Sequence, residues 1–289
     1  MTKALFPFWT RRHLLAGAGL LAPLPVFAQT IRATPGTQAL DDKDATQDDA
    51  THDSSTLDAR TDANNHLTIA VMINGKGPFR FIVDTGAERS VIADNVATAL
   101  GLPQGKSVVL EGIGGRVTAG TVHVEALSFG PFRRNNLNLP VLPRRNLFAD
   151  GYLGLDAING TRVTFDFANH AIIIEQPRNS FAAEGPDTAR VRAKGNNGRL
   201  RVMDCMVNSV GAIAFIDTGA EVSVGNRALY NKLISRNHSL DSSAVMTLTG
   251  VTGGTVIGEL IPIYRIRLRE LSFTDGTLVI ADVPDFSIW

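Results

Sequence analysis

Two aspartates stand in nearly identical surroundings in this 289-residue chain. Asp84 begins the run DTGAERSV and Asp217 begins the run DTGAEVSV, so that seven of eight positions agree. Each aspartate follows a short apolar run, residues 81–83 in the first case and 215–216 in the second. Such a run favours a buried strand, and Thr-Gly directly after it favours a turn. The pattern predicts two carboxyl groups, each carried from a buried strand into a turn.

Two such carboxyl groups could carry out acid–base chemistry together. Partial burial raises the pKa of an aspartate. If the two turns meet about an approximate two-fold axis, both carboxyl groups cannot ionise, and they share one proton near neutral pH. The ionised group could then act as general base on a water molecule, while the protonated group polarises a carbonyl. The pair therefore suggests hydrolysis with water as the nucleophile and no cofactor.

The sequence around the two aspartates indicates an internal repeat. Each is followed by a glycine-rich run, a Leu-Ser-Phe triplet and an apolar run with proline: residues 112–115, 127–129 and 139–143 in the first half, and residues 250–254, 271–273 and 279–284 in the second. Chance would not preserve this order. We expect two similar lobes, residues 66–178 and 188–289, joined by a linker.

Both expected lobes consist mainly of short apolar runs bounded by Gly, Pro and Asn, which is typical of strands. Apolar and polar residues alternate at residues 67–71 and 263–268. Helical signal is confined to residues 90–100 and 226–233. The sequence predicts an all-β fold of closed barrels or packed sheets, with the two lobes related by a pseudo-two-fold axis.

The doubled Asp-Thr-Gly-Ala motif resembles the active site of the aspartic proteases, and the retroviral-type, retropepsin-like branch more closely than the pepsin-type branch. The resemblance implies a single-chain bacterial form with two β-barrel lobes. It also implies that Asp84 and Asp217 are the catalytic pair of an endopeptidase. The expected partner is a peptide or protein substrate, and the expected state is a monomer that forms an intramolecular pseudo-dimer.

The same resemblance implies roles for the residues after each aspartate. Thr85 and Thr218 should link the two active-site loops by hydrogen bonds, while Gly86 and Gly219 let the backbone approach the carboxyl groups closely. The next residues are Ala87 and Ala220, where pepsin-like members place a hydroxyl that donates to the carboxylate. Fewer donors lower the pKa less. We therefore expect an activity optimum at mildly acid pH, roughly 4 to 6.5.

Two further features match the family: a glycine-rich run in each half, and one apolar segment in the first half. The glycine-rich runs resemble the tips of flaps, mobile hairpins that close over substrate: Gly112, Ile113, Gly114 and Gly115 in the first half, and Gly250, Gly253 and Gly254 in the second. Residues 152–156, YLGLD, match the hydrophobic-hydrophobic-Gly segment that packs behind an active-site loop. No similar segment follows Asp217, so we expect the second lobe to be incomplete at its C-terminal end or completed in another way.

The N-terminal region has a different character from the lobes. Positive residues precede an apolar run at 14–24 that is too short to span a bilayer, and small residues end at Ala28. This predicts a signal peptide at residues 1–28, with Arg11-Arg12 resembling a twin-arginine signal, or alternatively an uncleaved signal anchor. Residues 29–65 are rich in Asp, which predicts a disordered acidic linker. We expect a periplasmic or secreted protein, without stable membrane insertion after signal cleavage.

Composition argues against other functions. Lys plus Arg and Asp plus Glu both number 28, so no basic excess indicates nucleic-acid binding. The single cysteine, Cys205, excludes a multi-cysteine metal site and is expected to be an ordinary strand residue. Two alternatives to a single-chain protease stay open. One is a catalytically weak or inactive peptide-binding or regulatory module of the same fold. The other is a homodimer in which Asp84 meets Asp84, against which the intact Asp217-Thr218-Gly219 argues.

Overall fold

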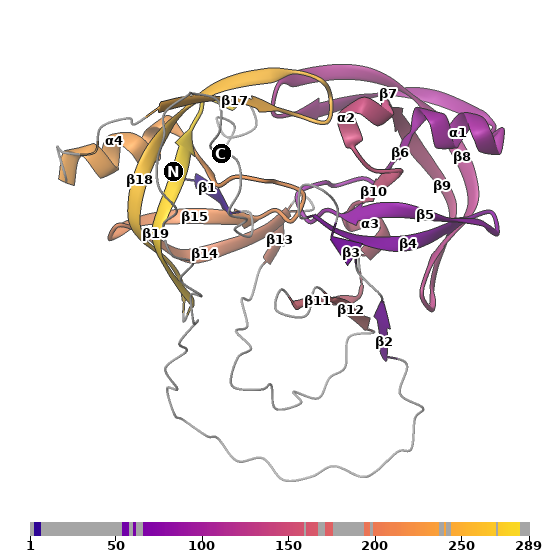
Figure 1. Cartoon of the computed structure of the whole chain (residues 1–289), viewed down its shortest axis with the longest axis horizontal. Helices are drawn as coiled ribbons and strands as arrows, with labels where there is room; N and C mark the ends of the chain where they lie inside the picture. Colours follow the sequence, from indigo (N-terminus) through magenta and orange to yellow (C-terminus); the bar gives the residue numbers. More distant parts are fainter. Residues whose placement is uncertain are drawn as a thin grey trace, which may run out of the picture.

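The computed structural model describes residues 3–6, 54–57, 60–61, 66–158, 160–166, 171–175, 194–196, 199–236, 240, 244–269 and 271–283. Their strands form two eight-stranded sheets and one three-stranded sheet. Each large sheet curls into one lobe, and the two lobes lie side by side (Figure 1). The expectation of an all-β fold with two lobes is confirmed.

The first lobe is a closed barrel with two additional strands. Its strands are β3 (Arg60–Thr61), β4 (Leu67–Ile73), β5 (Lys76–Val83), β6 (Val91–Ala93), β7 (Gln104–Gly112), β8 (Gly115–Phe129), β9 (Phe132–Leu142) and β10 (Gly151–Leu153). They are arranged in the order β3-β4-β5-β10-β6-β9-β8-β7. An additional pairing between β4 and β8 closes the ring. Three short helices, α1 (Asp94–Leu100), α2 (Arg144–Leu147) and α3 (Leu155–Ile158), complete this lobe.

The second lobe repeats this arrangement with one exchange. Its strands are β13 (Lys194–Asn196), β14 (Arg199–Val207), β15 (Val210–Ile216), β16 (Val224–Gly225), β17 (Ala244–Thr249), β18 (Thr255–Leu268) and β19 (Leu271–Ile280), with helix α4 (Arg227–Arg236). The order is β13-β14-β15-β1-β16-β19-β18-β17, and pairing of β14 with β18 closes the ring. The position that β10 holds in the first lobe belongs here to β1 (Lys3–Phe6).

Each lobe has its own apolar core, and the strand patterns explain why. In β4 the apolar residues Ile69, Val71 and Ile73 are fully buried, while Ala70 faces solvent. Such alternation is expected of a strand with one face on a core. Separate clusters of buried residues fill the two barrels. Each core is closed by its own sheet, and among the described residues the lobes meet mainly at the segments near the two aspartates and at two long hairpins.

Two sequence-based expectations need correction. Part of the segment expected to be a disordered linker is ordered: Ser54–Leu57 forms β2, and Arg60–Thr61 forms β3 at the edge of β4. Strand β2 carries no charged side chain and pairs with the open edge of β12, which supplies backbone partners that the sequence alone does not reveal. The helix expected from residue 90 starts at Asp94. Residues 91–93 form β6 instead, since they pair with β9 and their side chains are buried.

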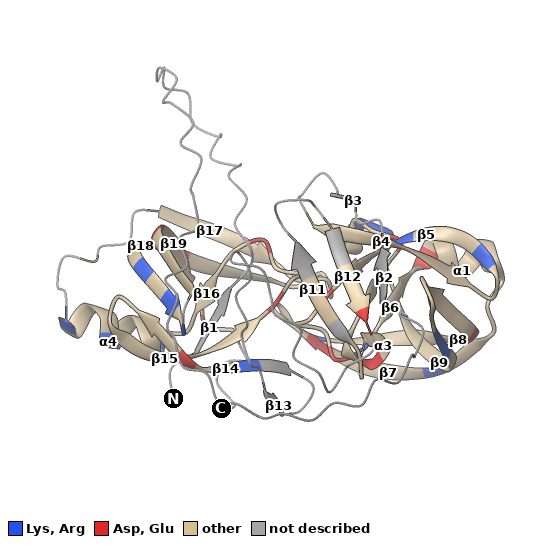
Figure 2. Ribbon diagram, turned by 90° about the horizontal axis from the view of Figure 1, so that it is seen from below, with Lys and Arg blue, Asp and Glu red and all other residues tan. Residues whose placement is uncertain are grey.

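Strand β2 belongs to the small sheet, together with β11 (Arg162–Asp166) and β12 (Ala171–Glu175). This sheet lies under the first lobe, beside α3, as the view from below shows (Figure 2). The rest of the acidic segment, the predicted cleavage site and the expected linker between the lobes lie outside the described residues. Within the described part of the chain, no helix has the length and apolar character needed to cross a membrane.

Candidate active site

The two aspartates sit in turns that follow equivalent strands. Asp84 comes directly after β5, and Asp217 directly after β15. In the first turn the backbone N–H groups of Gly86 and Ala87 donate to Asp84 Oδ1, at 2.8 and 3.1 Å. In the second turn the N–H of Gly219 donates to Asp217 Oδ1 at 2.9 Å. Each carboxyl group is therefore held by the loop that carries it.

Two threonines join the loops across the lobe interface. The N–H of Thr85 donates to Thr218 Oγ1 at 3.1 Å, and the N–H of Thr218 donates to Thr85 Oγ1 at 3.2 Å. Their hydroxyls in turn donate to main-chain carbonyls of the opposite lobe, Thr85 to Ile216 at 2.8 Å and Thr218 to Val83 at 2.6 Å. This reciprocal set of hydrogen bonds fixes the distance and orientation of the two loops, as the family resemblance implied.

The loops bring the two carboxyl groups together. A Cβ placed on Gly86 would lie 2.5 Å from Asp217 Oδ2, and one placed on Gly219 would lie 2.7 Å from Asp84 Oδ2. Real Cβ atoms essentially never approach so closely, so each carboxyl group packs against the glycine of the opposite loop. Glycine is required at both positions because any side chain would displace the partner's carboxyl group.

This environment favours the protonated form of Asp84. The residue is buried, and desolvation raises its pKa well above the usual value for aspartate. The negative charge of Asp217 and a hydrogen bond between the two carboxyl groups raise the pKa further, whereas the N–H groups of Gly86 and Ala87 lower it. Because two neighbouring carboxyl groups cannot both be ionised, the pair of Asp84 and Asp217 holds one proton between them.

A second layer of contacts supports the first loop. Ser90 donates through its N–H and its hydroxyl to Asp156 Oδ1, at 2.8 and 2.7 Å, and the N–H of Gly154 donates to Ser90 Oγ at 3.0 Å. The N–H of Asp84 itself donates to the carbonyl of Leu153 in β10 at 2.9 Å. The segment expected to pack behind the loop therefore does so. Sequence reasoning did not assign a role to Ser90, although its recurrence as Ser223 was the available signal.

The two glycine-rich runs form the tips of long hairpins that meet each other (Figure 1). The tip between β7 and β8 carries Ile113, and the tip between β17 and β18 carries Val251. Ile113 packs against a second-lobe cluster that includes Leu248, while Val251 packs against the core of the first lobe. The tips thus exchange apolar side chains, which favours a closed arrangement.

Backbone contact between the tips depends on glycine. The main chains of Gly114 and Gly254 lie against one another so closely that a Cβ on either residue would overlap the other. Of the remaining glycines, Gly112 and Gly115 are the strand residues on either side of the first turn, and Gly250 and Gly253 lie in the second. Apart from Gly115, which has open space beside it, the glycines expected at the flap tips lie close to residues of the opposite lobe.

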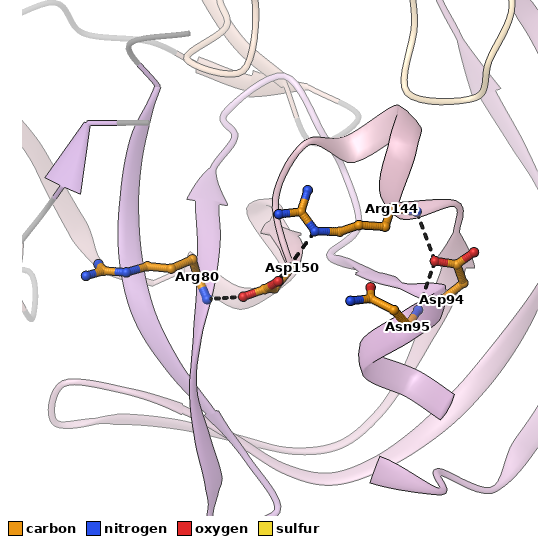
Figure 3. Close-up of polar contacts among 5 residues, drawn as sticks. All are labelled: Arg80, Asp94, Asn95, Arg144 and Asp150. Atoms are coloured by element: carbon orange, nitrogen blue, oxygen red, sulfur yellow. Dashed lines mark hydrogen bonds and ion pairs between the residues drawn. The ribbon is translucent and has the colours of Figure 1, made fainter. Parts of the chain in front are cut away.

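Helix α2 provides a further contact that sequence reasoning missed. The side-chain amide of Asn146 donates to the carbonyl of Val251 in the opposite tip at 3.3 Å. The helix is anchored at Arg144, whose N–H donates to Asp94 Oδ1 at 2.9 Å and whose guanidinium lies 3.5 Å from Asp150 (Figure 3). Asp150 also accepts from the N–H of Arg80 at 2.8 Å. This network holds Asn146 where it reaches the second-lobe hairpin.

Other candidate chemistry finds no support in the described part of the chain. No cluster of three or more His, Cys, Asp or Glu side chains suited to a metal ion occurs among these residues. Cys205 lies in β14 and is buried, as expected, and desolvation raises the pKa of its thiol to about 12. Such a thiol is almost entirely protonated at neutral pH, and only the thiolate is an effective nucleophile.

Comparison with known proteins finds a matching family and a similar solved structure. The sequence pattern of the family described as "Aspartyl protease" matches residues 69–157, from β4 through α3. No curated protein matches the sequence. Among solved structures, the chain is similar to a retropepsin-like aspartic protease from Rickettsia conorii, with 20% identity and a TM-score of 0.31, over 43% of this chain and 90% of that one. The first lobe therefore carries the sequence pattern of the aspartyl protease family, and a second lobe with the same strand order accompanies it.

Proposed function

We propose that this protein is an aspartic endopeptidase in which Asp84 and Asp217 of one chain activate the attacking water. The observation that carries the proposal is the packing of each carboxyl group against the opposite loop's glycine. Together with the raised pKa of Asp84, this arrangement provides one protonated and one ionised carboxyl group side by side. These are the two states that general acid–base hydrolysis of an amide requires.

The reaction follows from these two states. The ionised carboxylate takes a proton from water as the water oxygen forms a bond to the peptide carbonyl carbon. The protonated carboxyl donates its proton to the carbonyl oxygen, so that a neutral tetrahedral diol results. Its collapse breaks the C–N bond, returns one hydroxyl proton to a carboxylate and delivers a proton to the leaving amine. The threonine hydrogen bonds keep the pair in register, and the hairpin tips limit access of bulk water.

A single chain supplies both halves of this site, which favours the pseudo-dimer over a homodimer with two copies of Asp84. The hydrogen bonds between Thr85 and Thr218 use residues of both lobes of one chain. The Asp84 loop already makes these contacts with the Asp217 loop of the same chain. The Asp84 loop of a second copy would therefore have no free loop to pair with. We propose a monomer acting on peptide or protein substrates without a cofactor.

Cleavage of a peptide library by the full chain between pH 3 and 8 tests this function. We expect cleavage to fall by at least 100-fold in Asp84→Asn and in Asp217→Asn, since each lacks one carboxyl group of the pair. Asp275→Asn removes a carboxyl group from an exposed position in β19 and should cleave like the original protein. Loss in Asp84→Asn alone would favour the homodimer. Peptide binding without turnover in the unmodified chain would favour the inactive binding module.

We also propose that the protein is exported to the periplasm or secreted. The proposal rests on the arginine pair Arg11-Arg12 followed by an apolar run and small residues before Ala28. Fractionation of bacterial cells that express the full chain tests it. Replacing both arginines by lysine should retain the protein inside the cell if the twin-arginine route is used. Equal export of this variant and the unmodified chain would contradict that route.

A further inference from the structure

The second lobe contains a strand that comes from the far end of the sequence. In each barrel a short central strand lies between the strand that leads into the active-site loop and the strand that leaves it. In the first lobe this is β10, between β5 and β6. In the second lobe it is β1, between β15 and β16; Figure 1 shows β1 beside β15. The ring of the second barrel is therefore closed only when residues 3–6 are in place.

The two central strands have the same directions and the same register. Each runs parallel to the strand before the aspartate and antiparallel to the strand after it. Tyr152 of β10 lies opposite Val91, and Leu5 of β1 lies opposite Val224. Val91 and Val224 end the two matching runs DTGAERSV and DTGAEVSV. Residues 4–6 thus occupy the places that residues 151–153 occupy in the first lobe.

The first lobe shows what the central strand contributes to a loop. The carbonyl of Leu153 accepts the N–H of Asp84, and Leu155, two residues further along at the start of α3, donates its N–H to the carbonyl of Ala87. The loop that carries Asp84 is therefore attached to the central strand at one point and to the helix that follows this strand at another. The Asp217 loop is flanked in the same way by β15 and β16, and β1 is the strand that pairs with both of them.

We propose that residues 3–6 are a positioning element for Asp217: they form the strand that completes the second barrel and supports its active-site loop. The catalytic consequence rests on the function proposed above, whereas the placement of the strand does not. The same residues form the start of the predicted signal peptide. Cleavage after Ala28 would remove β1 and leave the facing edges of β15 and β16 without their partner. The complete second lobe therefore belongs to the uncleaved chain.

A disulfide cross-link tests the placement without reference to activity. The double variant Leu5→Cys/Val224→Cys places two thiols on directly paired residues of antiparallel strands, where Cβ atoms approach closely enough for a disulfide. The double variant Leu5→Cys/Val91→Cys is the matched control, because Val91 holds the equivalent position in the first lobe. After mild oxidation with diamide, mass spectrometry of the full chain should find the 5–224 disulfide at least tenfold more abundantly than the 5–91 disulfide. Equal or absent cross-linking would overturn the placement.

A proline substitution tests the effect on the active site. Leu5→Pro removes a backbone N–H from a strand paired on both sides, whereas Leu5→Ala keeps it. We expect kcat to fall at least tenfold in Leu5→Pro, with KM changed less than threefold and with the larger part of kcat retained in Leu5→Ala. A synthetic peptide of residues 1–9 should restore kcat of Leu5→Pro in a saturable manner. This rescue distinguishes a missing strand from general unfolding.

The outcomes separate this inference from the proposed function. Unchanged kcat in Leu5→Pro, or failure of the peptide to restore a lost kcat, would overturn the positioning role. Absence of cleavage by the unmodified chain would refute the proposed function. In that case a selective 5–224 cross-link would still establish residues 3–6 as the central strand of the second barrel.

Discussion

Replacing Thr85 by valine should destabilise the protein strongly, because one hydroxyl serves both loops. Thr85 Oγ1 donates to the carbonyl of Ile216 and accepts from the N–H of Thr218. Valine has nearly the same volume but makes neither bond, and the residue is buried, so water cannot replace the hydroxyl. Each buried polar group left without a partner costs about 1–3 kcal/mol. With two such groups, the free energy of unfolding should fall by about 2–6 kcal/mol.

Urea unfolding followed by circular dichroism measures this loss. Thr85→Ser keeps the hydroxyl and should retain most of the stability lost in Thr85→Val. Thr218→Val removes the reciprocal bonds, and the double valine variant should lose less than the sum of the two single losses, because the two hydroxyls also contact each other at 3.4 Å. A change below about 0.5 kcal/mol in Thr85→Val, which is typical of a neutral surface substitution, would refute the reasoning that the threonines hold the two lobes together.

Three further predictions concern the pair, the hairpin tips and the cysteine. The raised pKa of Asp84 means that the folded protein binds a proton more tightly than the unfolded chain, so stability should decrease as pH rises above the ordinary pKa of aspartate and toward the folded pKa. Urea midpoints between pH 4 and 8 should show this trend, and Asp84→Asn should flatten it; a rising trend in the unmodified protein would contradict it. Gly114→Ala should raise KM at least fivefold, because the new Cβ overlaps Gly254 and parts the tips, whereas Gly120→Ala, which meets nothing within 4 Å, should not; equal KM values would count against contact between the tips. Cys205 should react with Ellman's reagent only after denaturation, since its thiol is buried with a pKa of about 12; prompt labelling of the native protein would contradict this.

Much of the fold could be predicted from local sequence. The two alternating segments, residues 67–71 and 263–268, lie in strands as expected, the first in β4 and the second in β18. These predictions succeed because a half-buried strand imposes a period of two on side-chain polarity. Residues 91–93 are all apolar and directly precede a helix. With no alternation of apolar and polar residues, the local sequence does not distinguish a short strand from the first turn of that helix. Pairing with β9 decides their conformation.

The candidate site shows the same division. The two Asp-Thr-Gly motifs predicted the aspartates, the threonine hydrogen bonds and the glycines, because the chemistry and the close packing restrict residue type at each position. Asn146 carried no signal, since its contact is with Val251 in the other lobe. A contact between residues so far apart in sequence depends on how the two barrels dock, and the type of one side chain in a short helix does not encode that.

By itself, the sequence determined that two carboxyl groups of one chain sit at the ends of buried strands, and that two similar β-rich halves carry them. Local patterns suffice for this because burial, turns and glycine requirements act on neighbouring residues. Only the tertiary structure decided how the second barrel is closed. Residues 3–6 read as part of an export signal, and four residues have too little pattern to reveal a strand. Their place depends on the unpaired edges that β15 and β16 present, which exist only once the rest of the barrel has folded.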